Sequence, residues 1–524
     1  MDITKLCDVL RATLNPEQRQ QAETQLNEVL KIIGFVPTLL QTVMSDQVDV
    51  VVRQAGVIYL KNVICQFWEE KEPVAPTDPV PFSIHEQDRQ AIRDNIVEAV
   101  IHAPTPIRVQ LAVCISQMVK HDYPGRWPGI AEKVAMFLQS DQHETWMGAL
   151  ICLYQLVKNF EYKKPEERGT LNQAMVVILP LIHQRCMQLL PDQSEASVAL
   201  QKQILKCFFA LIQFFLPLDL ITKEMFTQWM ELVRQIVERP VPDHCNQADE
   251  DERPMLIWWK CKKWAMHILA RCFERYGSPG NVTKEYNQFS EWYLKTFSAG
   301  ILQVLMKQLD EYRQKRYVSP RVLQQAVNYL NQGVSHAVSW KIMKPHLPVL
   351  IQDVVFPLVC HSDDDEELWQ SDPVEYIRIK YDVFEEFFSP VTAAQTLLHT
   401  AVSKRKEVLQ KTMGFIMSVL TASGLEPRQK AGALHMVGAV ADVLITKKIY
   451  KDQAEMMIVT HVFPEFASPH GYLRARACWV LNQFAEVKYK NQANLQQALE
   501  LARNALCTDK ELPVGSDHNS GDPT

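Results

Sequence analysis

The chain has 524 residues, more than the roughly 250–300 at which a single hydrophobic core stops growing, so we expect several domains or one extended repeat array. Only 17 residues are glycine, about 3% against a usual ~7%, which disfavours all-β folds and most phosphate-binding glycine loops. The formal net charge of -6 provides no global positive field to hold nucleic acid or acidic lipid.

The N-terminus and the cysteines indicate a broad cellular class. Met1 is followed by an acid, Asp2, and no apolar segment of signal-peptide type comes next, so we expect no secretory signal. The longest uncharged stretches, such as residues 169–184, are shorter than the ~20 apolar residues of a bilayer crossing, and we expect no membrane insertion. The closest of the 12 cysteines, Cys261 and Cys272, are eleven residues apart, which fits neither a disulfide framework nor a CxxC motif. We therefore expect reduced thiols in the cytosol or nucleus, with no metal and no cofactor.

Apolar positions recur with helical spacing along almost the whole chain, and the helices form pairs. The second helix of most pairs carries a basic residue just before or within an apolar run. These markers lie at residues 52–55, 107–110, 201–204, 259–262, 320–323, 377–380, 427–430 and 473–476, with one unmarked pair around residues 146–160. The second helices are expected to be the inner, doubly contacted ones, so residues 57–68, including Ile58, are expected in the core.

The spacing of these markers indicates a repeat class. From Arg53 to Arg474 the chain runs 421 residues in eight steps, about 53 per step, and the last step from Arg428 takes 46 residues. The last value lies within the ~40–47 residues of HEAT and armadillo repeats, and insertions lengthen the others. A helical hairpin of this size cannot bury both faces alone, so it stacks on its neighbours. The sequence therefore predicts an all-α fold, an α-solenoid of about nine to ten HEAT-like helical hairpins.

Proline-rich and polar segments are expected to separate the helices. The segments expected to be irregular are residues 69–83, 121–129, 239–254 and 361–373. The last ten residues, 515–524, contain no Leu, Ile, Val or Phe and are expected to be a disordered polar tail.

A search for catalytic motifs finds none. The patterns GxGxxG, GxxxxGK[ST], GxSxG and HExxH do not occur, and His244 beside Cys245 has no further ligands at metal-site spacing. His121 beside Asp122 fits the stabilisation of a turn better than half of a catalytic pair. We therefore predict no catalytic residues and no enzyme.

Two acidic insertions concentrate negative charge in expected loops, near residues 243–253 and 361–373. The second contains five consecutive acids, Asp363, Asp364, Asp365, Glu366 and Glu367. A solvated linker is the ordinary interpretation of such a run. The alternative is a loop that faces a bound partner, and Trp369, which a solvated linker does not need, favours this alternative.

Several blocks of the chain carry a resemblance to a known family. They are VRQAGVIYLKN (residues 52–62), KHDYPGRWPG (residues 120–129), and the segments at residues 153–168, 258–286, 365–378 and 389–409. The chain resembles the importin-β superfamily, most closely its importin-7 branch with importin-8 next, from the N-terminus to about Val514. The block at residues 365–378 also resembles exportin-2.

The resemblance implies a nuclear transport receptor that moves between cytoplasm and nucleus through the nuclear pore at the nuclear envelope. Residues 1–121 would form an importin N-terminal domain that holds the small GTPase Ran in its GTP form, and residues 122–514 would continue one solenoid. The outer face would meet nucleoporins with phenylalanine-glycine repeats. The inner face would hold basic protein cargo, such as ribosomal proteins and histones, sometimes alongside importin-β, and Ran-GTP would release that cargo. No direct binding of nucleic acid is implied.

The resemblance also implies candidate residues for the Ran-binding face. On the N-terminal second helices these are Arg53, Gln54, Lys61, Asn62 and Arg108, and Gln54 and Lys61 share a helix face because they are seven residues apart. The acidic run at residues 363–367 falls in about the eighth repeat, where importin-β relatives place an acidic loop against Ran. Solvation or repeat-to-repeat bonding is the alternative role for each N-terminal residue.

Importin-7-like chains are roughly twice this long, so the chain is expected to correspond to an N-terminal half, with an exposed apolar repeat end that lowers solubility and weakens cargo binding. Two other functions remain open. One is a passive HEAT scaffold with no link to a GTPase. The other is an export receptor like exportin-2, whose cargo affinity Ran-GTP would raise.

Overall fold

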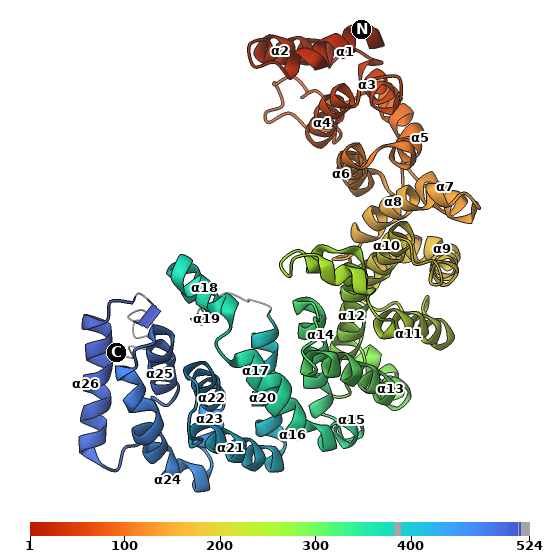
Figure 1. Ribbon diagram of the computed structural model, residues 1–524. Coiled ribbons are helices and arrows are strands. Elements are labelled where there is room, and N and C mark those ends of the chain that lie inside the picture. Colours follow the sequence, from red (N-terminus) through yellow and green to blue (C-terminus); the bar gives the residue numbers. More distant parts are fainter. Residues whose placement is uncertain (382–388, 512, 515–524) are drawn as a thin grey trace. The chain divides into compact units, whose positions relative to one another are not determined.

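The computed structural model describes residues 1–381, 389–511, 513 and 514, and in these residues every regular element is a helix (Figure 1). The prediction of an all-α fold is thus confirmed, and so is the α-solenoid class. The expected tail at residues 515–524 lies outside the described residues.

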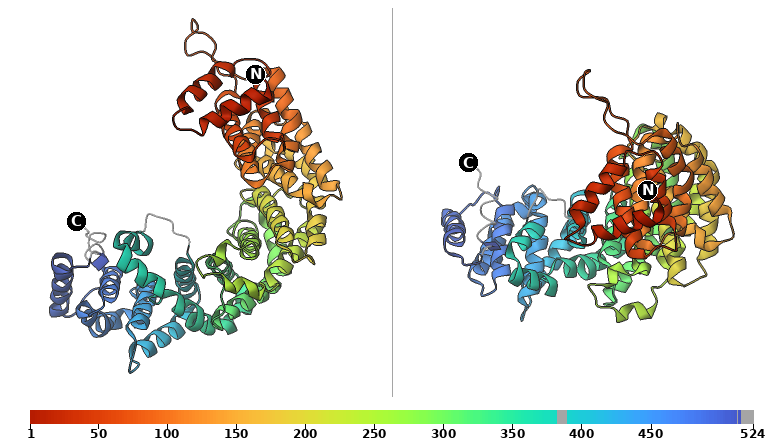
Figure 2. Two further views of the ribbon diagram at one scale, coloured as in Figure 1. Left: turned by 45° about the horizontal axis from the view of Figure 1, so that its top comes forward. Right: turned by 90° about the horizontal axis from the view of Figure 1, so that it is seen from above.

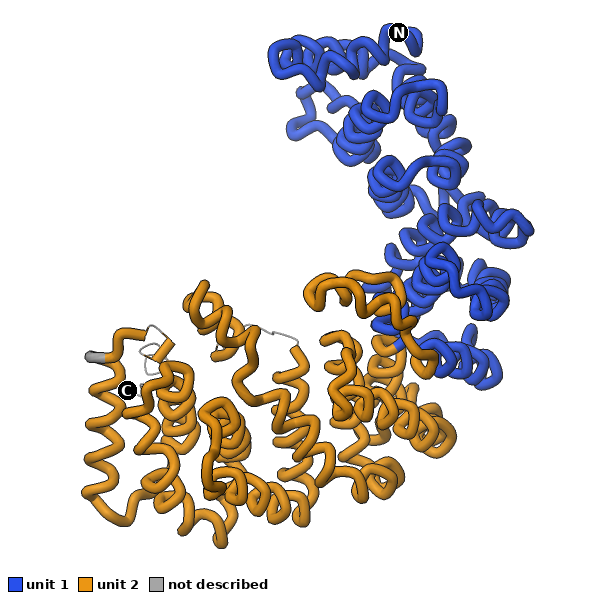
Figure 3. Tube along the Cα trace, in the orientation of Figure 1, with its two compact units in different colours: residues 1–236, 260–265 blue, residues 237–259, 266–524 orange. Residues whose placement is uncertain are grey.

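The chain divides into two compact units (Figure 3). Unit 1 comprises residues 1–236 and 260–265, and unit 2 comprises residues 237–259 and 266–524. The boundary between them falls within α11 (Lys223–Glu238) and α12 (Ile257–Arg275). A separate domain ending at residue 121 is not one of these units, and that boundary stays a prediction.

Unit 1 consists of helix pairs in chain order. Its pairs are α1 (Ile3–Thr13) with α2 (Arg19–Val29), α3 (Phe35–Met44) with α4 (Val50–Phe67), α5 (Glu86–His102) with α6 (Thr105–Asp122), α7 (Gly129–Gln139) with α8 (Trp146–Lys158), and α9 (Gly169–Leu189) with α10 (Glu195–Ile212). The second helices also pack along one another, α4 on α6, α6 on α8 and α8 on α10. A second helix therefore has neighbours on the side of its own first helix and on both flanks, which buries residues such as Leu60, Ile115 and Leu153 completely.

Unit 2 continues the same pattern with more interruptions. Its helices are α13 (Asn287–Arg313), α14 (Pro320–Val334), α15 (Ala337–Met343), α16 (Leu347–Leu350), α17 (Phe356–Val359), α18 (Asp363–Ser371), α19 (Pro373–Tyr381), α20 (Pro390–Lys404), α21 (Lys406–Leu420), α22 (Pro427–Ala439), α23 (Ala441–Leu444), α24 (Lys448–Met457), α25 (Gly471–Gln483) and α26 (Gln492–Thr508). The pairs are α13 with α14, the run α15–α17 with α20, and α21 with α22, and the helical turns that continue α24 (Ile458–Val462 and Phe463–Ala467) pack on α25. The second helices again form a layer, with α14 on α20 and α22 on α25.

One predicted second helix is wrong. Arg378, the marker at residues 377–380, lies in the short helix α19, whereas the second helix of this pair is α20, which packs along α14. The signal that the basic-residue pattern missed is the N-cap of α20, where the Ser389 side chain accepts a hydrogen bond from the Thr392 backbone N–H at 3.1 Å, followed by Pro390 at the first helical position. Helices α18 and α19 are therefore an insertion within the eighth pair.

The proline-rich segment at residues 69–83 projects from the helices of unit 1 as an irregular loop, as predicted (Figure 2). Its tip is solvated, since the side chains of Val74 and Val80 are fully or largely exposed. Its base is closed by a backbone hydrogen bond from Ile84 N–H to the Phe67 carbonyl at 2.9 Å, and by an edge-to-face contact of Phe67 with Phe82.

By length and composition alone, one helical run among the described residues, Ala337–Ser371, could cross a membrane. The core helix of a soluble protein passes the same test. Trp340, Met343, Leu347 and Leu350 of this run are buried within the folded chain.

Candidate partner-binding surfaces

Two of the predicted N-terminal site residues have structural partners within unit 1. Arg53 is buried, and its Nε donates to the carbonyl oxygen of Val43 at 2.8 Å, near the end of α3. Arg108 donates from Nε to the Val100 carbonyl at 3.0 Å and from Nη2 to the Ile101 carbonyl at 3.2 Å, near the end of α5. The last carbonyls of a helix lack partners within it, so each arginine stabilises the first helix of its pair.

The same arrangement explains why polar residues mark the second helices. Gln201 of α10 donates to the Leu189 carbonyl at the end of α9 at 3.0 Å. Arg405, which precedes the first helix α21 and is not one of the predicted markers, satisfies the Val334 carbonyl at the end of α14 at 2.8 and 3.0 Å. In the marker at residues 201–204 it is therefore the amide of Gln201, and not the neighbouring Lys202, that satisfies the preceding helix. At three of the predicted repeat markers, Arg53, Arg108 and Gln201, the polar side chain is thus a capping group.

The other predicted N-terminal residues form one stripe along α4. Gln54 and Lys61 are half-buried and Asn62 is exposed, and Ile58 lies between them on the same face with 46% of its surface exposed. The expectation that Ile58 belongs to the core is therefore wrong. The sequence does contain a sign of this exposure. Ile58 lies four residues after Gln54 and three before Lys61, so all three share one helix face, and that face is otherwise polar.

Helix α6 adds two more exposed apolar side chains. Val109 and Val113 are 57% and 41% exposed and lie one turn apart. Because α4 and α6 have first-helix neighbours on one side and second-helix neighbours on their flanks, their exposed stripes face away from the first helices. We call Gln54, Ile58, Lys61, Asn62, Val109 and Val113 the α4–α6 stripe. Exposed apolar side chains with polar ones around them match the apolar core and polar rim of a protein-binding face.

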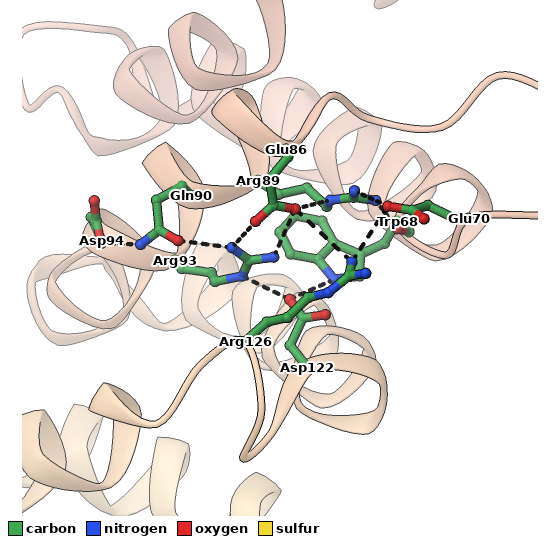
Figure 4. Close-up of polar contacts among 9 residues, drawn as sticks. All are labelled: Trp68, Glu70, Glu86, Arg89, Gln90, Arg93, Asp94, Asp122 and Arg126. Atoms are coloured by element: carbon green, nitrogen blue, oxygen red, sulfur yellow. Dashed lines mark hydrogen bonds and ion pairs between the residues drawn. The ribbon is translucent and has the colours of Figure 1, made fainter.

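A buried polar network supports these helices (Figure 4). Arg93 of α5, 1% exposed, donates from Nε to Asp122 Oδ2 at 2.8 Å and from Nη1 to Glu86 Oε1 at 2.7 Å. Trp68 at the end of α4 donates from Nε1 to the same Asp122 oxygen at 3.1 Å. Asp122 at the end of α6 is itself buried, so one carboxylate links three helices. The Asp122 carboxylate thus joins helices, a role that the prediction of a stabilised turn did not include.

The rim of this network joins the loop at residues 69–83 to α5. Arg89 donates to the Trp68 carbonyl at 3.0 Å, to Glu86 at 2.9 Å, and to Glu70, which also receives Arg126 at 3.4 Å. Hydrogen bonding from Arg89, followed by its charge and that of Arg126, holds the pKa of Glu70 below its ordinary value. The pKa of Glu86 is lowered as well, so the carboxylates of Glu70 and Glu86 both stay ionised and hold the base of the loop against α5.

The acidic run at residues 363–367 is not the loop that was predicted, because it begins helix α18. The Ser362 side chain accepts from the Asp365 N–H at 3.1 Å, and the Asp365 side chain accepts from the Ser362 N–H at 3.0 Å, which is a capping box. Four acids in the first turn also complement the positive end of the helix dipole. In this chain the dense acidic run directly after Ser362 therefore marks the start of a helix.

Three of the five acids have partners inside unit 2. Asp365 pairs with Lys380 of α19 at 2.7 Å, Asp363 pairs with Arg428 of α22 at 2.6 Å, and Glu366 bonds to His361 at 2.8 Å. Burial alone would raise the pKa of Asp365, but the Lys380 ammonium, as a charge and as a donor, holds that pKa below its ordinary value. Asp364 and Glu367 are exposed and form no ion pair with described residues, so they are open to a cationic partner.

Trp369 anchors this insertion. It is buried and meets Tyr376 of α19 edge to face at a centroid distance of 4.9 Å. It also lies against Gly471 at the start of α25, where a Cβ would come within 2.6 Å of the indole ring. In the sequence Trp369 favours a loop that faces a bound partner, but its packing within unit 2 accounts for it without one. The predicted site residues accordingly fall into two groups, one in unit 1 and one in unit 2.

Replacing Ser362 with alanine is expected to loosen the first turn of α18. The capping oxygen is lost while the acids remain, and such a loss costs about 1 kcal/mol of helix stability. Hydrogen exchange at the Asp365 amide should become roughly fivefold faster. Ser418→Ala, on the exposed face of α21, is the matched control and should leave that exchange unchanged. Unchanged exchange in S362A would contradict the capping role.

A pocket of about 510 Å³ lies between the first helices α21 and α24 in unit 2. Four methionines contribute to its wall, Met413 and Met417 from α21 and Met456 and Met457 from α24, beside polar groups that include Asp452 and His461. Gly414 also lines it, and a Cβ at this position would meet nothing within 4 Å. Flexible thioether side chains adapt to varied apolar ligands, so the pocket suits an apolar or aromatic side chain.

The part of the chain that the structure describes holds no group of three or more His, Cys, Asp or Glu side chains arranged to bind a metal ion.

Comparison with known proteins agrees with these features. Residues 22–102 match the family "Importin-beta N-terminal domain", and residues 104–245 match the family "Exportin 1-like protein". Importin-8 of Mus musculus is 55% identical over 514 residues, which cover 98% of this chain and 51% of that protein. The probable importin-7 homolog of Dictyostelium discoideum is 28% identical over 507 residues, covering 94% and 47%. The expected order is therefore corrected, because importin-8 fits better than this importin-7 homologue.

The chain spans about half the length of the curated relatives it matches. Solved structures with the same fold include the exportin Cse1 in its cargo-free, cytoplasmic state, with a TM-score of 0.72 and 17% identity over 99% of this chain and 56% of that one. They also include the karyopherin Kap121p bound to RanGTP, with a TM-score of 0.51 and 14% identity over 99% and 44%. Helix pairs, family matches and the similarity to importin-8 lead to one conclusion. The chain belongs to the importin-β superfamily.

Proposed function

We propose that the chain acts in nuclear import, binding Ran in its GTP form through the α4–α6 stripe and carrying basic protein cargo between cytoplasm and nucleus. The observation that carries this proposal is the stripe itself. Ile58, Val109 and Val113 are exposed apolar side chains on second helices, in or next to the region that matches the importin-β N-terminal domain. Exposed apolar groups rimmed by polar ones supply the central contacts of protein interfaces.

Fold neighbours support the choice of partner. Kap121p, whose fold this chain shares, has been solved bound to RanGTP, and Kap95p, with a TM-score of 0.61 and 14% identity, has been solved with RanGDP. Arg53 and Arg108 are occupied by helix carbonyls, so within the predicted set Gln54, Lys61 and Asn62 are the polar contacts we assign to Ran.

The acidic helix α18 supports a cationic partner. Asp364 and Glu367 are exposed and unpaired among the described residues, whereas Asp363, Asp365 and Glu366 hold the helix in place. Carboxylates on an ordered helix raise the association rate of a basic partner, and no conformational entropy of a loop is lost when the partner binds. We assign this helix to a basic surface of Ran or of cargo.

We assign the methionine-lined pocket between α21 and α24 to the phenylalanine rings of nucleoporin repeats. The pocket lies between first helices, and its volume of about 510 Å³ admits an aromatic ring. Kap95, which shares the fold at a TM-score of 0.61 and 14% identity, has been solved in complex with Nup1, and this supports the assignment.

Replacing Gly414 with leucine is expected to fill this pocket and to reduce binding of a phenylalanine-glycine repeat peptide about tenfold. The new side chain enters space that is open in the folded chain, and leucine favours a helix over glycine, so stability should not fall. Gly300→Leu in α13, another helical glycine whose Cβ would meet nothing within 4 Å, is the matched control. Peptide titration followed by NMR measures both, and equal affinity of G414L and the parent chain would contradict the assignment.

The import function is tested by cargo release. A basic histone-tail peptide bound to the chain should dissociate when Ran-GTP is added, and by reciprocity the peptide should weaken Ran-GTP by the same factor. Ran-GTP that strengthens peptide binding would indicate export, as in an exportin-2-like receptor. Peptide binding that ignores Ran in either nucleotide state would indicate a passive helical scaffold.

A further inference from the structure

Five lysine side chains gather on the second helices of unit 1, away from the α4–α6 stripe. Lys158 ends α8, Lys202 and Lys206 lie one turn apart on α10, and Lys260 and Lys263 lie on the part of α12 that belongs to unit 1. We call these five residues the lysine cluster. Helix α8 packs along α10, and Phe209 of α10 meets Trp264 of α12 edge to face, so the three helices are adjacent.

The ammonium groups of the lysine cluster act on one another. Burial first, and then the ammonium groups of Lys206, Lys260 and Lys263, lower the pKa of Lys202. Burial likewise lowers the pKa of Lys206, and the charges of Lys158 and Lys260 lower it further. Among the described residues no carboxylate lies within 4.0 Å of the ammonium groups of Lys158, Lys202, Lys206 or Lys260.

Capping of the preceding helix does not account for the two lysines of α10, Lys202 and Lys206. The arginines at comparable places, Arg53 and Arg108, satisfy the carbonyls of the preceding helix, and in α10 Gln201 already does so. Half-buried ammonium groups that repel one another cost free energy, which an anion bound across them would offset. The cluster is therefore complementary to a negatively charged partner, in contrast to the basic partner that suits α18.

The aromatic side chains of the cluster favour a peptide over a nucleic acid. The Lys206 ammonium lies over the Tyr154 ring at 4.5 Å and over the Trp264 ring at 5.7 Å, and Lys158 lies over Tyr154 at 5.6 Å. Single-stranded nucleic acid is held by bases stacking on open aromatic faces. Here those faces carry ammonium groups, which leaves donors for carboxylates but no platform for bases.

We propose that the lysine cluster binds an extended acidic segment of a partner protein. Adjacent packed helices lie about 8–10 Å apart, so the three helices span roughly 16–20 Å between their axes. An extended chain advances ~3.3 Å per residue, so about six acidic residues cover the cluster. The proposal rests on unit 1 alone and requires neither Ran nor basic cargo.

The test uses the full chain and a fluorescein-labelled peptide of eight Glu and Asp residues, titrated by fluorescence anisotropy. Binding should weaken steeply between 50 mM and 500 mM salt, because screening shortens the range of these charges. Lys202→Gln with Lys206→Gln should lower the affinity about tenfold. The control is Lys447→Gln with Lys451→Gln at the start of α24, two exposed lysines with the same spacing, and it should change affinity less than twofold.

Three outcomes would overturn the proposal. One is an unchanged affinity in the K202Q/K206Q chain whose circular dichroism and melting match those of the parent. Another is an equal loss in both lysine pairs, which would indicate a nonspecific charge effect. The third is a single-stranded RNA of eight nucleotides that binds more tightly than the peptide and loses affinity with K202Q/K206Q, which would assign the cluster to nucleic acid.

Discussion

Replacing Arg93 with methionine is expected to weaken the N-terminal helices of unit 1 by about 3–5 kcal/mol. The methionine fills the space of the arginine stem, but the buried carboxylate of Asp122 then keeps only the indole N–H of Trp68. An unpaired charge in a buried site is the reason for the size of this effect. Repeat arrays do not unfold in one step, so native-state hydrogen exchange of α5 and α6 amides is the suitable measurement.

The network provides its own controls. Replacing Arg126 with methionine should lower the stability of these helices by less than about 1 kcal/mol. Its side chain lies at the rim of the same network and is 53% exposed. The double variant Arg93→Met with Asp122→Leu should recover part of the lost protection, because both charges are then removed. If R93M and R126M raised the exchange rates equally, the buried ion pair would not be the element that holds these helices together.

Replacing Ile58 with aspartate is expected to reduce Ran-GTP affinity at least thirtyfold, as for a residue at the centre of an interface. The side chain is 46% exposed, so the substitution places a charge on the α4–α6 stripe without opening the core. Surface plasmon resonance with immobilised Ran-GTP measures the loss. Melting curves of the variant should match those of the parent chain.

Ile449→Asp is the matched control, since Ile449 is 72% exposed at the start of α24 in unit 2 and should leave Ran affinity unchanged. An I58D chain that binds Ran-GTP as tightly as the parent would remove Ile58 from the interface and with it the observation on which the proposed function depends.

Helical pairing could be predicted from the sequence because it follows from local periodicity. At the first two markers the structure supplies a physical reason that the sequence does not reveal, namely that Arg53 and Arg108 satisfy the carbonyls of the preceding helix. The same fact makes them poor predictions of a binding face. The sequence pattern around an arginine near a helix start is the same in two cases. In one the arginine bonds the carbonyls of the preceding helix, and in the other it faces a binding partner.

The insertion in unit 2 shows the limit of composition. Acids at residues 363–367 suggested a loop, although Ser362 followed by Asp365 is a capping box and the first turn of a helix favours negative charge. The pairs Asp365–Lys380 and Asp363–Arg428 join residues 15 and 65 positions apart, so only the folded chain shows which acids are occupied. Ile58 was missed for the converse reason, because a single apolar residue within an apolar run looks like core.

The measurement that tests the proposed function most directly is the affinity of the 524-residue chain for Ran in its two nucleotide states. The α4–α6 stripe, as a Ran-GTP interface, predicts a dissociation constant at least tenfold lower for Ran-GTP than for Ran-GDP, a difference of about 1.4 kcal/mol or more. Equal affinity for the two forms, or no binding of either, would contradict it.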